Sequence, residues 1–141
     1  MSKNPLAAYA PLNIMIVDDD PFLAELSADH YRGLDFQVDV ASDGNAALAM
    51  MEARLPDLVL CDRKMPELSG SALLEIIRSR DAAWQKMVFV FVTGLTDHRD
   101  RFAMLDLHPD GYLCKPINFT RDDAELARFL ARKRTMAALS R

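Results

Sequence analysis

Short apolar runs alternate with longer amphipathic stretches from Leu12 onward. The runs at 12–17, 57–61 and 87–92 are largely continuous in apolar residues, whereas 36–40 alternates as a half-buried strand does. A short fifth run covers 111–114. Strands that alternate with helices favour a parallel sheet with both faces covered. The pattern therefore predicts an α/β domain with a doubly wound five-stranded parallel sheet.

The stretches between these runs carry helix signals at their ends. Asp20 is placed to cap a helix with Pro21 in its first turn, and Gly33 is placed to end it. Thr120 and Asp123 resemble a capping box for the last helix. The expected helices cover about 21–33, 44–54, 70–80, 97–107 and 118–132.

The length of 141 residues suits one domain, which we place at 12–134 between a loose N-terminal arm (1–11) and a C-terminal tail (135–141). A formal charge of −4 disfavours nucleic acid and anionic membranes as partners. No apolar run approaches the roughly 20 residues of a membrane helix, and the N-terminus lacks the apolar core of a signal peptide. We expect a cytoplasmic protein.

Polar residues with chemical potential stand where the predicted strands end. Asp18 and Asp19 follow the first strand, Asp62 the third, Thr93 the fourth and Lys115 the fifth. The carboxyl ends of parallel strands share one edge of the sheet, where such folds bind ligands. Carboxylates about 4 Å apart repel by roughly 4 kcal/mol at an effective dielectric near 20, and a bound cation removes this cost. Their oxygens suit Mg²⁺ (or Mn²⁺).

A carboxylate nucleophile beside a metal and a lysine is suited to phosphoryl transfer. An aspartate can attack phosphorus and form an aspartyl phosphate. The metal and the ammonium of Lys115 would neutralise the oxygens of the transferring group, and the hydroxyl of Thr93 can donate to one of them.

Four segments in register resemble the receiver domain of two-component response regulators, as in the single-domain chemotaxis-type regulators. They are IMIVDDDP (14–21), LVLCDRKMPELSG (58–70), VFVTG (90–94) and GYLCKP (111–116). The resemblance covers about 12–132 and implies a flavodoxin-like (βα)5 fold with strand order 2-1-3-4-5. It implies that Asp62 accepts the phosphoryl group.

The resemblance also assigns roles to the surrounding residues. Asp19 and Asp62 would ligate the metal directly with the backbone carbonyl of Lys64, and Asp18 would act through water. Thr93 and Lys115 would be the switch hydroxyl and the phosphate-pairing lysine. Gly94 would leave room for the phosphoryl group. Tyr112 would be the aromatic switch residue, drawn in from the outer surface when Thr93 turns to the phosphoryl group.

The sequence departs from the family's usual pattern at several positions. His108 stands where glycine is frequent before the last strand, and Pro109 follows it. Lys64 and Leu95 flank the site where other members often carry residues that orient water. The segment 80–86 contains Trp84 and lacks the usual proline. None of these departures removes a residue expected to take part in the chemistry.

The implied partners are a histidine kinase or histidine phosphotransfer protein, and a downstream protein or second copy that reads the face formed by 97–132. An aspartate-nucleophile phosphatase of the haloacid dehalogenase type is the enzyme alternative, but Pro21 and Phe22 stand where that family's threonine is expected. Too few residues follow Lys115 for a helix-turn-helix, so we expect no direct DNA binding. The chain could be the receiver piece of a longer protein.

Overall fold

A single parallel sheet organises the computed structural model, which describes residues 4–65, 67–94 and 107–139. Its five strands lie in the order β2-β1-β3-β4-β5, and all neighbours are parallel. This confirms the expected fold class and strand order. The strands are β1 (Asn13–Val17), β2 (Gln37–Ala41), β3 (Leu58–Asp62), β4 (Val88–Thr93) and β5 (Gly111–Cys114).

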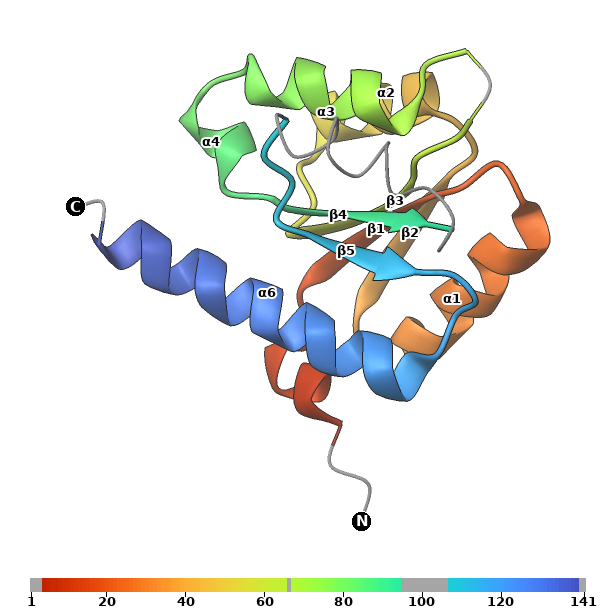
Figure 1. Ribbon diagram of the computed structural model, residues 1–141, viewed down its shortest axis with the longest axis vertical. Coiled ribbons are helices and arrows are strands. Elements are labelled where there is room, and N and C mark those ends of the chain that lie inside the picture. Colours follow the sequence, from red (N-terminus) through yellow and green to blue (C-terminus); the bar gives the residue numbers. More distant parts are fainter. Residues whose placement is uncertain (1–3, 66, 95–106, 140–141) are drawn as a thin grey trace.

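Helices cover both faces of the sheet (Figure 1). One face carries α1 and α6, and the other carries α2, α3 and the short α4. The helix expected at 97–107 lies outside the described residues. The helices are α1 (Pro21–Gly33), α2 (Gly44–Ala53), α3 (Gly70–Arg78), α4 (Ala82–Gln85) and α6 (Phe119–Leu139).

The strand side chains divide between two apolar clusters. Ile14 and Ile16 of β1 point to the cluster shared with α1 and α6, whereas Met15 and Val17 point to the cluster shared with α2 and α3. This alternation follows from the two-residue period of a strand. Because both faces are buried, the central strands need nearly continuous apolar sequence.

Side-chain caps fix where several helices begin. The carboxylate of Asp20 accepts hydrogen bonds from the N–H groups of Phe22 and Leu23, as expected. The last helix differs from our expectation of a Thr120–Asp123 capping box. Asn118 accepts from the N–H of Arg121, and Asp122 accepts from the N–H of Asn118. The capping pair therefore lies earlier than the pair predicted from the sequence.

The N-terminal segment also differs from the loose arm expected there. Residues Pro5–Tyr9 form a short 3-10 helix, η1, that packs against α6. Leu6 is fully buried in the core. The amide of Asn4 donates to the buried carboxylate of Asp123 at 2.8 Å, and His30 Nε2 lies 2.6 Å from the same oxygen. An apolar anchor and a buried polar contact therefore hold this segment from Asn4 onward.

The C-terminal boundary differs as well. We expected the last helix to end near 132 and a tail to begin at 135, but α6 continues to Leu139. Its final turns leave the body of the domain, and Met136 and Leu139 are exposed there (Figure 1). In the described part of the chain, no helix is long and apolar enough to cross a membrane.

His108 adopts a left-handed backbone conformation, with φ of 54°. Glycine enters this region at little cost, whereas a side chain is disfavoured there. Arg78 donates to the carbonyls of Leu107 and His108 and so holds this turn. A left-handed turn at this position is a physical reason for the glycine that is frequent there in the family that the sequence resembles.

Candidate functional site

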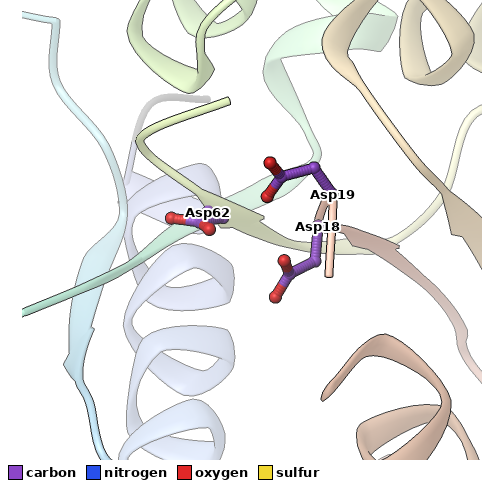
Figure 2. A group of neighbouring side chains, drawn as sticks. All are labelled: Asp18, Asp19 and Asp62. Carbon is purple, nitrogen blue, oxygen red and sulfur yellow. The ribbon is translucent and has the colours of Figure 1, made fainter. Parts of the chain in front are cut away.

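Three carboxylates meet at the carboxyl ends of β1 and β3. Asp18 and Asp19 follow β1, and Asp62 is the last residue of β3. Each offers one oxygen, and these oxygens lie within 4.8 Å of one another. Figure 2 shows the three side chains close together, with Asp18 and Asp19 on one side of Asp62. The cluster predicted from the sequence is therefore formed.

Local hydrogen bonds orient these carboxylates. Asp18 Oδ1 accepts from the N–H of Asp20 at 2.9 Å, and Asp62 Oδ1 accepts from the N–H of Lys64 at 3.3 Å. The second contact sets Lys64 beside the cluster. Asp19 is exposed. It lines a groove of about 490 Å³ together with Arg63, Lys64 and residues near the start of α3. The site therefore opens to solvent on the Asp19 side.

Burial and like charge act together on Asp18. Loss of hydration raises the pKa of this carboxyl above its usual value, and the neighbouring Asp62 carboxylate acts in the same direction. The Asp20 N–H and the Lys115 ammonium oppose the shift without cancelling it. A cation at the cluster would favour the ionised form of Asp18. The donor set and its excess negative charge fit a hard divalent ion such as Mg²⁺.

Lys115 and Thr93 complete the site from the other side. Lys115 Nζ lies 3.3 Å from Asp62 Oδ2, and the Asp62 side chain is only 12% exposed. The N–H of Lys115 donates to the carbonyl of Thr93 at 2.8 Å, so the backbone fixes the two residues relative to each other. The Lys115–Pro116 peptide bond is cis. Thr93 ends β4 and is buried.

Two glycines shape the space around Asp62. A Cβ on Gly94 would meet no atom of the described residues within 4 Å, so that part of the chain leaves open space beside Thr93. A Cβ on Gly70 would lie 2.5 Å from the carbonyl oxygen of Asp62, a severe clash. The sequence pattern alone did not single out Gly70, although this residue closes the family-like segment 58–70. Glycine is required at this position because the backbone at the start of α3 approaches the end of β3 closely.

Tyr112 differs from its expected starting position. We expected the ring at the outer surface before any switch, but it packs inward against Phe91, with ring centroids 6.1 Å apart and planes 21° from parallel. It joins the cluster on the α2 and α3 side of the sheet. Leu95, the other residue noted beside the site, lies outside the described residues.

The chain matches the family model of the response regulator receiver domain over residues 14–126. It is 32% identical over 125 residues to the transcriptional regulatory protein TrcR of Mycobacterium tuberculosis, covering 87% of this chain and 47% of TrcR. It is 32% identical over 124 residues to the response regulator Rre1 of Synechocystis, covering 87% of this chain and 53% of Rre1. The chain thus spans about half the length of these relatives.

Solved structures agree with the fold. The signal receiver domain of a histidine kinase from Syntrophus aciditrophicus is 26% identical with a TM-score of 0.78, covering 85% of this chain and 90% of that one. The chemotaxis protein CheY4 of Vibrio cholerae has a TM-score of 0.79 at 22% identity, covering 86% of this chain and 100% of that one. The second likeness concerns the fold alone.

Proposed function

Because the chain belongs to the response regulator receiver domain family, we propose that Asp62 accepts a phosphoryl group from a phosphohistidine donor. The chain is a signalling module of two-component systems and not a classical enzyme. One observation carries the residue assignment. Asp62 belongs to the carboxylate cluster and also forms an ion pair with Lys115. The proposed nucleophile therefore lies next to both the proposed metal site and a positively charged side chain.

The chemistry follows from these positions. A carboxylate oxygen of Asp62 attacks phosphorus, and the new O–P bond forms as the N–P bond to the donor imidazole breaks. The imidazole leaves with the bonding electron pair and takes up a proton from solvent. Lys115 then pairs with a phosphoryl oxygen, and the Thr93 hydroxyl donates to another. Gly94 leaves space for the transferred group.

Asp18, Asp19 and Asp62, with the backbone carbonyl of Lys64, would hold Mg²⁺ (or Mn²⁺). When bound, the ion neutralises negative charge that gathers on the phosphoryl oxygens. The chain's own residues supply the rest. They place the nucleophile, neutralise one side of the phosphoryl group through Lys115 and set the buried Thr93 beside it.

Thr93 and Tyr112 form the proposed switch. The inward position of the Tyr112 ring is one of two, and phosphorylation favours it because Thr93 is then held toward the phosphoryl group. A coupling of about 1–3 kcal/mol biases such an equilibrium, whereas a swing from 1:99 to 99:1 takes about 5.5 kcal/mol. The partner therefore completes the transition. The proposed readout face, 97–132, includes β5 and the first part of α6, and its remainder lies outside the described residues.

The proposed donor is a histidine kinase or a histidine phosphotransfer protein in the cytoplasm, and the reader is a downstream protein or a second copy. Some relatives, such as the DNA-binding response regulator MtrA of Mycolicibacterium smegmatis, are named for DNA binding, and the chain covers 44% of MtrA. The net charge of −4 on the 141 residues of this chain disfavours DNA as their partner, so the proposed partners are proteins.

Thermal unfolding with Mg²⁺ and fluoroberyllate, a phosphoryl mimic, tests this function. Ligands that bind only the folded state raise its stability by RT ln(1 + [L]/Kd). The melting temperature should rise in the native protein and in Asp29→Asn, which removes an exposed aspartate of α1. It should not rise in Asp62→Asn. An equal rise in Asp62→Asn would assign the mimic to another site.

A further inference from the structure

A basic groove lies at the end of the sheet opposite the carboxylate cluster. It runs between α4 and the C-terminal half of α6, beside the turn that precedes β5, and its volume is about 680 Å³. Figure 1 shows these elements together at the amino-terminal ends of the strands, away from the strand ends that carry Asp18 and Asp62. The groove is therefore separate from the phosphorylation site.

The charge of the groove opposes that of the chain. Its lining includes five arginine or lysine residues and one acid, Asp110, whereas the whole chain carries −4. The five basic residues come from α3, the segment after α4, and α6. They are Arg78, Lys86, Arg132, Lys133 and Arg134.

Asp110 cannot balance this charge. Its carboxylate already forms ion pairs with Lys133 Nζ at 2.9 Å and with Arg78 at 3.5 Å. It also accepts a hydrogen bond from the N–H of Phe89. Lys86, Arg132 and Arg134 have no carboxylate partner among the described residues. Arg132 donates to the carbonyl of Asp110, and Arg134 lies over the ring of Tyr9 at 4.7 Å. Three cationic side chains thus line a concave surface without an acidic partner.

The groove also offers apolar surface. Pro109 and Ala82 line it on one side, and Met136 and Ala137 line it from α6. A volume of this size lies within the range of about 300–1,000 Å³ that small-molecule sites occupy. The planar guanidinium group of arginine can pair with two phosphate oxygens at once. A polyphosphate concentrates several negative charges in a small volume, whereas the carboxylates of an acidic peptide are spaced along the chain.

We propose that this groove binds a small phosphorylated nucleotide, with its phosphates on Lys86, Arg132 and Arg134 and its base against the apolar side. The ligand would link α4 to the projecting end of α6. Binding should weaken as salt is added, because these cationic side chains are exposed or half-buried. It should not require Asp62.

Calorimetric titration of the full chain with ATP, in EDTA to exclude divalent ions, tests the proposal. The double variant Lys86→Gln/Arg134→Gln and the variant Ala137→Glu should each weaken ATP binding by about tenfold or more, a loss of ~1.4 kcal/mol. Arg128→Gln lowers the net charge by one unit, as Ala137→Glu does, but at an exposed site of α6 outside the groove, and it should leave affinity within about twofold. Asp62→Asn should bind as the native protein does.

The comparison ligands identify the class. Tripolyphosphate should bind more weakly than ATP, and adenosine more weakly still. No binding of millimolar ATP, or equal binding by the groove variants, overturns the site. Equal affinity for tripolyphosphate and ATP would contradict the proposed contact of the base with the groove. Tighter binding of a hexaglutamate peptide than of ATP would assign the groove to an acidic protein segment and contradict the proposal that it binds a nucleotide.

Discussion

Lys115 Nζ lies 3.3 Å from Asp62 Oδ2, although 53 positions separate the two residues in the chain. The parallel sheet causes this proximity, because β3 and β5 flank β4 and all three strands end at the same edge. The pair gives the nucleophile a neighbouring positive charge on the side away from Asp18 and Asp19.

Lys115→Ala should therefore slow phosphorylation of Asp62 by about a hundredfold, the typical cost of removing one group that stabilises developing charge. The rate is measured by intact-protein mass spectrometry with a small phosphodonor. Lys86→Ala, which removes an exposed lysine far from the site, is the matched control and should react at the native rate. A native rate in Lys115→Ala would remove this lysine from the chemistry.

Thr93→Ala and Tyr112→Ala should reduce the difference in partner affinity or self-association between the free and phosphorylated states. In the proposed switch, Thr93 would contact the phosphoryl group, and the Tyr112 ring, which packs on Phe91, would transmit its position. Tyr112→Ala should still be phosphorylated at the native rate. An unchanged affinity difference in both variants would exclude this route.

Leu6→Ala should lower the free energy of unfolding by about 2–5 kcal/mol, because it empties a fully buried position between η1 and α6. Leu139→Ala makes the same change at a residue that is 80% exposed and should stay within about 0.5 kcal/mol of the native value. Urea unfolding measures both. Equal stabilities would mean that the N-terminal segment does not pack as described.

The sequence predicts the site better than the periphery, for a physical reason. Asp18, Asp62 and Lys115 are placed by strand ends, and a parallel sheet brings such ends together whatever the loops do. The docking of Asn4 on Asp123 depends on a contact across 119 positions, which no local pattern encodes. The end of α6 at Leu139 was also missed, because no glycine or proline after Pro116 marks where the helix stops.

The inward Tyr112 ring and the Asn118–Asp122 cap illustrate the same limit on a smaller scale. In both cases the sequence is compatible with more than one arrangement. The ring of Tyr112 can lie inward or outward, and either of two side-chain pairs can cap the last helix. Gly70 is the instructive exception, because its close approach to the Asp62 carbonyl requires a residue without Cβ. A glycine at the start of a helix that follows the phosphoacceptor loop could have been recognised.

Cys61 should resist alkylation in the folded protein at alkaline pH. Burial, with the nearby Asp62 and Asp18 charges, raises the pKa of the Cys61 thiol well above its usual value. The folded state thus favours the protonated thiol, so this group's stabilising contribution is complete below its unfolded pKa of about 8.5 and is lost as pH rises above that value.

Iodoacetamide labelling followed by mass spectrometry measures this protection. Cys114, which is partly exposed, should be labelled first and serves as the internal control. Both cysteines are free, and β4 lies between the strands β3 and β5 that carry them. Rapid labelling of native Cys61, or a Cys61–Cys114 disulfide in the purified protein, would contradict the strand arrangement.

The central claim is that Asp62 is the phosphoacceptor and that the carboxylate cluster makes its phosphorylation depend on a divalent metal. Intact-protein mass spectrometry after incubation with acetyl phosphate tests both parts, with Asp62→Asn as the variant and Asp29→Asn as the matched control. One added phosphoryl group should appear in the native protein and in Asp29→Asn when Mg²⁺ is present, and it should be lost with EDTA and in Asp62→Asn. Full labelling of Asp62→Asn, or labelling of the native protein undiminished by EDTA, would contradict the claim.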